Sequence, residues 1–318
     1  MATAMTRTVD IDTLYSTTFA YSKRKWVNNI FLATRLLTFM ASKKVVQPRG
    51  GTEWRLPVLM GRNNTVTVID EGGEVSTEGD DPVRIARYEP KIMVASVKRV
   101  FTFEHKNAGK EQLIDMVDTS IDVAKNEISQ TIEEYLCGEE TKGLTGFAGM
   151  IKTDPTASAE VGGINQSEQS WWRNQTYALQ GDAADYLSKD LRHLSRLCSK
   201  FGPTPDFMLT GGDVWEIIMD VLEEKHLFFD DEMKDLGWPD TPVFQHKPIV
   251  YSEEAPDETL RLVNSEDVKM FYDKALWFSL GDWIGAQTNV NRVAHIKCAW
   301  QLVSHRLASS GVLTAVDG

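Results

Sequence analysis

The possible fold of this chain is constrained most by two stretches in which apolar and polar residues alternate. They lie on either side of an acidic segment that contains glycine. Val66 and Val68 alternate with threonines, and residues 83–87 (VRIAR) alternate again. Such alternation is typical of β-strands, and residues 70–74 (DEGGE) are typical of a turn. Folded as a hairpin over residues 52–88, each leg of about 18 residues would reach ~60 Å at ~3.3 Å per residue.

A hairpin of that length would extend well beyond a single compact domain. A compact body of ~300 residues has a radius of gyration near ~19 Å, and a long hairpin with few core residues is marginally stable alone. The sequence therefore predicts a hairpin that projects and lies on a partner. The alternative is a β-sheet that folds back inside one domain.

The next constraint is a long amphipathic helix predicted over residues 108–136. Its apolar residues recur every three or four positions, and Gly138 is expected to end it. At 1.5 Å per residue the helix would be ~42 Å long, which suits a structural beam. The apolar positions are Leu113, Val117, Ile121, Ala124, Ile128, Ile132 and Tyr135.

Charge is divided unevenly along the chain. The net charge is −12, which argues against a protein that simply coats nucleic acid, since phosphates would repel it. Residues 1–50 carry +6, because eight basic residues face two acidic ones, and the remaining 268 residues carry −18. Residues 21–42 read as an amphipathic helix. We expect a basic arm that docks on an acidic surface, either its own body or a neighbouring copy; a solvated helix is the alternative.

The pattern changes after the long helix. Residues 138–181 show no clear periodicity and carry Trp171 and Trp172, and loops this long are often functional. Residues 182–290 alternate between helix and strand patterns: helices over 182–200 and 213–222, and strands over 205–210, 242–251, 259–263, 268–272 and 275–280. Residues 292–316 predict one or two further strands.

No motif of a known catalytic, cofactor or metal site is present. The sequence has no HExxH, GxSxG or GxxxxGK[ST] motif. Asp230–Glu232 could bind a divalent ion, but a solvated acidic turn is the more frequent case. Cys137 or Cys298 could pair with a distant histidine, but buried unreactive thiols are commoner. We therefore predict no enzymatic activity, no cofactor and no metal. The sequence contains no run of ~18 apolar residues, so we expect no membrane span. Its three cysteines are far apart, so we expect no disulfide framework.

The order of these parts resembles the major capsid proteins of tailed bacteriophages, which have the Hong Kong 97-like fold. The resemblance covers nearly the whole chain and depends on the order of several short phrases, none of them a strong signature alone. These phrases are residues 143–144, 161–164, 171–174, 205–210, 244–250, 262–264 and 306–311.

The resemblance implies an α+β fold with named parts. They are an N-terminal arm (1–49), an extended loop lying over a neighbouring subunit (50–90), a peripheral domain (91–179) with the spine helix 108–136, an axial α/β domain (180–290), and a C-terminal return to the peripheral domain (291–318). We expect contacts between subunits at Trp54, Arg55, Arg62, Glu71, Glu74, Asp81 and Trp171.

The resemblance also implies function and partners. The chain would assemble with itself, as hexamers and pentamers, into an icosahedral head shell that encloses double-stranded DNA without sequence-specific binding. It would be part of the virion, assembled in the host cytoplasm, with portal and decoration proteins as further partners and no membrane. Fewer than 50 residues precede the loop, which favours a separate scaffold protein. Residues 45–90 contain no lysine, so we expect no isopeptide crosslink from this loop.

Two other interpretations stay open at this stage. One is an encapsulin-like compartment of the same fold that holds an enzyme cargo. The other is a soluble α/β enzyme that uses residues 182–290, which predicts a deep pocket with convergent titratable residues.

Overall fold

The computed structural model describes residues 34–60, 66, 68, 82–99, 116–157, 160–200, 202–223, 241–285 and 291–316. The chain forms two compact units. The described parts of Met93–Ile128 and Phe278–Lys297 belong to the smaller unit. The larger unit is built from Ala33–Ile92, Ser129–Trp277 and Cys298–Gly318.

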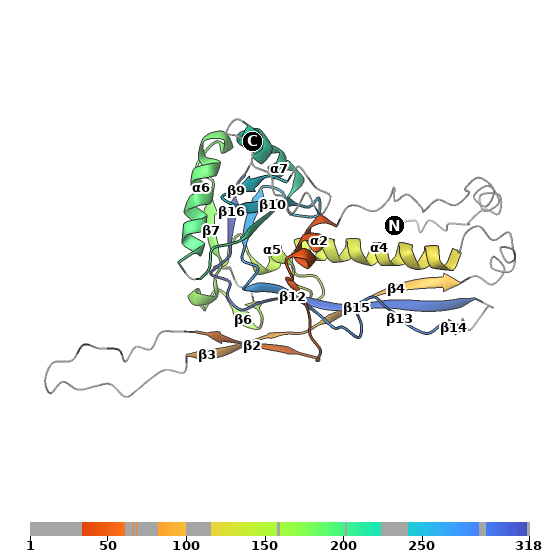
Figure 1. The fold of residues 1–318 in the computed structure, drawn as a ribbon. Helices are drawn as coiled ribbons and strands as arrows, with labels where there is room; N and C mark the ends of the chain where they lie inside the picture. Colours follow the sequence, from red (N-terminus) through yellow and green to blue (C-terminus); the bar gives the residue numbers. More distant parts are fainter. Residues whose placement is uncertain are drawn as a thin grey trace. The chain divides into compact units, whose positions relative to one another are not determined.

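A six-stranded mixed sheet with two helices organises the larger unit (Figure 1). The central strand β11 runs antiparallel to both neighbours, β8 and β16, and all five of its residues are buried. The helices α6 and α7 contact β7, β16 and β10. In order across the sheet the strands are β7 (Gln175–Ala178), β16 (Gly311–Thr314), β11 (Thr259–Val263), β8 (Phe207–Thr210), β10 (Lys247–Tyr251) and β9 (Val243–Phe244), and the helices are α6 (Ala183–Cys198) and α7 (Gly212–Glu223).

The core of this lobe lies between the sheet and the helices. Apolar residues four and three positions apart on α6 give it one buried stripe. The core residues are Leu187, Leu191, Leu194, Cys198, Met208, Val214, Ile218, Val221, Ile249, Leu260, Leu262, Leu313 and Val316.

A second sheet is arranged along β15 (Arg292–Ser304), which runs through both units. In the larger unit its second half pairs with β12 (Val268–Tyr272), and β12 pairs in parallel with β1 (Val46–Pro48). In the smaller unit its first half pairs with β13 (Ser279–Leu280) and β14 (Ile284–Gly285). The strand β4 (Lys91–Arg99) also pairs with β15.

The long helix α4 (Met116–Cys137) holds the short helix α2 (Arg35–Ser42) through one buried carboxylate. Glu133 is 2% exposed and accepts hydrogen bonds from the backbone N–H groups of Leu36 (2.9 Å) and Leu37 (2.8 Å). These donors lie in the first turn of α2, where backbone N–H groups lack helical partners. Burial raises the pKa of the Glu133 carboxyl above its usual range.

Four further short elements lie between α4 and α6 in the sequence. They are α5 (Phe147–Met150), β5 (Glu160–Val161), β6 (Ile164–Asn165) and the 3₁₀ helix η1 (Ser170–Trp172). The segment predicted to lack periodicity thus contains several very short elements. It is fixed by side-chain bonds such as Trp172 Nε1 to the Val161 carbonyl at 2.9 Å.

Most predicted elements are present, with changed bounds. The strands at 259–263 and 268–272 have the predicted bounds, and α4 ends one residue before Gly138. The single strand predicted over 242–251 was wrong. Gln245 and His246 have φ of 51° and 62°, so the chain turns there and β9 pairs back on β10. The strand predicted over 275–280 is limited to β13. Residues 21–33 and 108–115 of the predicted helices lie outside the described residues.

The two compact units have different bounds from the predicted arm, loop, peripheral and axial domains. Those divisions name parts of a shell subunit and stay predictions.

Candidate assembly surface

The predicted hairpin is represented by two paired strands, β2 (Trp54–Leu59) and β3 (Val83–Tyr88). They form an antiparallel ladder from Trp54 opposite Tyr88 to Leu59 opposite Val83. The Met60 N–H adds a bond of 2.6 Å to the Pro82 carbonyl. Figure 1 shows the two strands as a ribbon of their own. Both faces of a two-stranded ribbon would be open unless something covers them.

One face of this ribbon is covered by the chain itself. The indole of Trp54 is 3% exposed and meets Phe271 edge to face at a centroid distance of 5.5 Å. The Tyr88 hydroxyl donates to the Ser304 carbonyl at 3.1 Å. Burial raises the pKa of Tyr88, which keeps its hydroxyl protonated as a donor. Leu56, Val58 and Ala86 are also buried on this face.

The opposite face is open and has a polar end and an apolar end. At the polar end Arg55 stands opposite Arg87. The Glu53 carboxylate separates their charges, at 2.7 Å from Arg55 Nη2 and 3.8 Å from Arg87 Nε. Toward the other end come the pairs Pro57–Ile85 and Leu59–Val83.

The apolar end is exposed well beyond what its residue types favour. Leu59 is 75% exposed, Ile85 49% and Val83 46%. Val66 and Val68, further along the same segment, are 85% and 101% exposed. A run of exposed branched side chains on neighbouring strands is typical of a surface that another chain covers. We refer to Pro57, Leu59, Val83 and Ile85 as the open face.

The predicted contact residues have different positions. Trp54 is buried in its own chain. Arg55 lies at the polar end of the exposed surface and is bound to Glu53. Trp171 is half-buried, donates to Gln169 Oε1 at 2.8 Å and lies against Trp172. Arg62, Glu71, Glu74 and Asp81 lie outside the described residues. The intersubunit role of all seven residues stays a prediction.

Sequence reasoning did not select Leu59, Val83 and Ile85. The alternation over residues 83–87 was visible, but which alternate set was covered depended on Phe271 and Ser304, more than 180 residues away. The available signal was the apolar character of every second residue on both strands.

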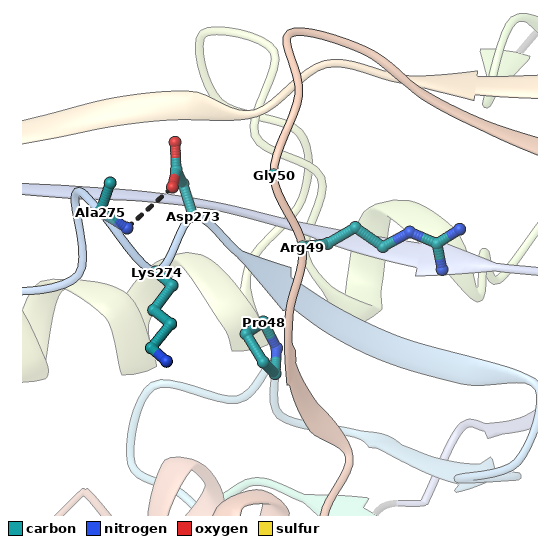
Figure 2. A pocket seen from close by; sticks show the side chains of 6 residues that line it. All are labelled: Pro48, Arg49, Gly50, Asp273, Lys274 and Ala275. Carbon is teal, nitrogen blue, oxygen red and sulfur yellow. Dashed lines mark hydrogen bonds between the residues drawn. The ribbon is translucent and has the colours of Figure 1, made fainter.

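An open pocket of about 520 Å³ lies beside β1 (Figure 2). Its charged residues do not converge: in Figure 2 the side chains of Arg49, Lys274 and Asp273 point in different directions. An Asp273 carboxylate oxygen accepts from the Ala275 N–H at 2.9 Å, which forms a local turn. Arg49 lies over the Phe271 ring at 5.0 Å. This lining holds no nucleophile next to a base.

The two cysteines weighed from the sequence lie in the interior of the described part of the chain. Cys137 and Cys298 are both fully buried, and burial raises the pKa of the Cys137 thiol. Asp230–Glu232 lies outside the described residues. Among those that are described, no three His, Cys, Asp or Glu side chains are grouped as metal ligands. No described helix is long and apolar enough to span a membrane.

Comparison with solved structures identifies chains of very similar fold. The capsid protein of the cyanophage A-1(L) superposes with a TM-score of 0.71 at 16% identity, covering 93% of this chain and 96% of that one. The SrpI encapsulin of Synechococcus elongatus gives 0.63 at 11% identity, covering 97% and 95%. The capsid of a native GTA particle gives 0.61 at 10% identity, covering 92% and 94%.

Sequence comparison alone finds no relative: no protein-family model matches the chain, and no curated protein matches it. The structural likeness extends over more than nine tenths of each chain, so it applies to the whole architecture. It confirms the α+β class and the predicted resemblance at the level of the fold. The chain therefore has the Hong Kong 97-like fold of phage capsid proteins.

Proposed function

We propose that this chain is the major capsid protein of a tailed bacteriophage, a structural protein without catalytic activity. It assembles with itself, as hexamers and pentamers, into an icosahedral shell that encloses double-stranded DNA. The observation that carries the proposal is the open face of β2 and β3. This face holds branched apolar residues up to 75% exposed, on a chain whose fold is that of shell proteins.

The open face needs a cover that a neighbouring copy supplies. Burial of an exposed branched side chain contributes ~1.5–3 kcal/mol. Leu59, Val83 and Ile85 lie side by side, so a single neighbour covers all three at once. In a closed shell every copy gives and receives this contact, because head-to-tail contacts repeat around a ring.

The net charge of −12 suits a container for DNA. A shell lined by cations would hold the phosphates at many points and oppose packing and release of the genome. The further partners we propose are a separate scaffold protein, a portal protein and decoration proteins. The shell would form in the host cytoplasm and become part of the virion.

Electron microscopy and sedimentation of the purified protein test the proposal, alone and co-expressed with a scaffold gene from the same genome. We expect round shells tens of nanometres across, or separate hexamers and pentamers. A uniform dimer or tetramer that never assembles, with or without the scaffold, would contradict the proposal and favour the enzyme interpretation.

The contents of the shells decide between a virus and a compartment. The encapsulin neighbour has the same fold, so shell formation alone does not separate the two. Nuclease-protected DNA of uniform length inside particles from infected cells supports the capsid. Particles that contain a co-purified enzyme and no DNA contradict it.

A further inference from the structure

One lysine is buried in the lobe formed by the six-stranded sheet with α6 and α7. Lys247, the first residue of β10, is 7% exposed. Its amine nitrogen donates a hydrogen bond of 2.6 Å to the hydroxyl of Ser195, which is 6% exposed and lies on α6. Lysine is almost never this buried unless a group of opposite charge pairs with it. Here the bonded acceptor is a neutral hydroxyl, so the site favours the uncharged amine.

The sheet side of the site offers one carboxylate, which is already engaged. In the parallel pairing of β10 with β8, Ile249 lies opposite Met208, so Asp206 is at the level of Lys247. Asp206 is exposed and accepts hydrogen bonds from both the backbone N–H and the hydroxyl of Ser265. Within the described part of the chain, no ion pair joins Lys247 to a carboxylate.

The helix side of the site adds a thiol and no charge. Cys198 lies three residues after Ser195, on the same face of α6, and is fully buried. Burial raises the pKa of the Cys198 thiol to about 12, so the thiol is uncharged at neutral pH. Burial also lowers the pKa of Lys247, and Cys198 and Asp206 oppose this shift less strongly. The residue paired with Lys247 on β9 is the apolar Phe244.

The last turns of α6 fit tightly against the sheet beside this site. A Cβ on Gly311 of β16 would lie 2.8 Å from the Cys198 sulfur and 2.9 Å from a methyl carbon of Leu194. Such close packing leaves the helix no room to shift inward. A charge at Lys247 is therefore relieved by movement of the helix away from the sheet, which also exposes the Cys198 thiol.

We propose that the attachment of α6 to the sheet is sensitive to pH and that Lys247 is the group that titrates. The uncharged amine holds the end of the helix through Ser195. The ammonium form favours an opened state in which water reaches both the amine and Cys198. This inference goes beyond the proposed function and does not depend on shell assembly.

The direction of the effect follows from burial. In the opened state Lys247 is solvated and has the ordinary pKa of a lysine. In the closed lobe its pKa is lower. The stability that this contact contributes is therefore fully present above the ordinary lysine pKa. It is lost as pH falls from there through the lowered value. Lower pH opens α6 more often, and higher pH closes it.

Thiol labelling of the full-length chain tests the proposal. Iodoacetamide modifies the protein at several pH values from 7 to 10, and peptide mass spectrometry follows Cys198 and Cys137 separately. Cys137 is fully buried on α4, so it reports opening elsewhere in the chain. In the wild type at pH 7, Cys198 should be labelled faster than Cys137, because local opening costs less than global unfolding.

The variant Lys247→Met replaces the amine with an apolar side chain of nearly the same length. At pH 7 its Cys198 should be labelled about tenfold more slowly than that of the wild type, because a buried charge is replaced by an apolar group. The ratio of the two rates should approach one as pH rises to 10. Comparison of the two proteins at the same pH removes the intrinsic pH dependence of the thiol.

Three further variants complete the test. Lys247→Gln can still bond Ser195 but cannot gain a proton, so it provides the same pH comparison if Lys247→Met does not fold. Ser195→Ala leaves the amine without its acceptor and should speed Cys198 labelling at every pH. Lys189→Met removes an exposed lysine from the same helix and should behave like the wild type.

Three results would overturn the proposal. The first is a rate ratio between the Lys247 variants and the wild type that stays constant from pH 7 to 10. The second is unchanged Cys198 labelling in Ser195→Ala. The third is equal labelling of Cys198 and Cys137 in the wild type, which would mean that α6 opens only when the whole chain unfolds.

Discussion

The lobe that contains β11 and the ribbon formed by β2 and β3 differ in how far their side chains are covered by the chain itself. In the lobe all five residues of β11 are buried, because strands flank it and helices cover the sheet. In the ribbon every second residue of β2 is buried and the others are exposed. The lobe buries its central strand within the chain, whereas the ribbon leaves one face exposed. Under the proposed function, the exposed face is the one that another copy would cover.

The two regions also treat charge differently. Arg261 of β11 is 3% exposed and bonds Thr259 Oγ1 at 2.8 Å, and burial lowers its pKa to about 10. Arg55 and Arg87 of the ribbon are exposed and share the half-buried carboxylate of Glu53. Buried charge in the lobe is fixed by hydrogen bonds, while surface charge in the ribbon stays available for exchange with water or a neighbour.

The largest stability effect is expected in the lobe. Leu262→Ala removes a fully buried side chain from β11 and should lower the free energy of unfolding by ~2–5 kcal/mol. The matched change on the ribbon, Ile85→Ala, removes a half-exposed side chain and should change it by less than about 1 kcal/mol. Denaturant unfolding of the unassembled protein measures both. Equal losses would erase the distinction between the two regions.

The second prediction concerns assembly. Ile85→Asp should reduce particle yield about tenfold or more, because an apolar contact worth ~1.5–3 kcal/mol is replaced by a charge. Its melting temperature should stay near the wild-type value, since the residue is 49% exposed. Ile85→Val keeps a branched apolar side chain and should assemble normally. Normal yield from the Asp variant would show that the open face is not a contact.

The sequence predicted the ribbon's strands but not its covered side. Alternation at residues 65–69 and 83–87 predicted a hairpin over residues 52–88, and β2 and β3 pair within that range. Residues 259–263 were predicted as a strand, and β11 has these bounds. The position of Trp54 was missed because an aromatic residue on a projecting hairpin looks unpartnered until Phe271 is placed beside it. Contacts between residues far apart in the sequence leave no local periodicity, so periodic patterns cannot predict them.

The same limit explains why the hydrogen bonds of Glu133 were not predicted. Its position on a predicted helix was clear, but the two backbone N–H groups it binds are 96 and 97 residues away. An acid among apolar helix positions was the only available signal. By contrast, the turn at Gln245 and His246 was missed although it is local, because the pair contains none of the Gly, Pro, Asn, Asp and Ser residues that dominate turns.

A third prediction tests how closely the chain approaches the covered face of the ribbon. Gly162 has φ +62°, and a Cβ there would lie 2.8 Å from the Tyr88 ring. Gly163 has φ +71° and nothing within 4 Å. Both Gly→Ala changes introduce left-handed strain of ~1–2 kcal/mol, but only Gly162→Ala adds the clash. In thermal unfolding, the Gly162→Ala variant should have a lower melting temperature than the Gly163→Ala variant. The reverse order would mean that Tyr88 moves away at no cost.

The fourth prediction uses pH. The folded-state pKa of Glu133 is raised by burial, so the folded chain favours the protonated carboxyl. Its contribution to stability is present below the ordinary carboxyl pKa and is lost as pH rises through the raised value. Glu133→Gln imitates the protonated form. The variant should therefore gain stability relative to the wild type as pH rises. Parallel unfolding curves of the two proteins from pH 4 to 8 would contradict this.

The smallest effect is expected at Glu53, the carboxylate between Arg55 and Arg87. Glu53→Gln leaves two arginines opposite each other on an exposed surface, which should lower the free energy of unfolding by only ~0–1 kcal/mol. The loss should shrink further in high salt, because screening weakens the repulsion that Glu53 offsets. Assembly is the sharper readout. If the polar end of the exposed surface meets a neighbour, the added positive charge changes particle yield at low salt while stability barely moves. If stability and yield fall together, Glu53 acts only within its own chain, and the contact with the neighbour is confined to the apolar end.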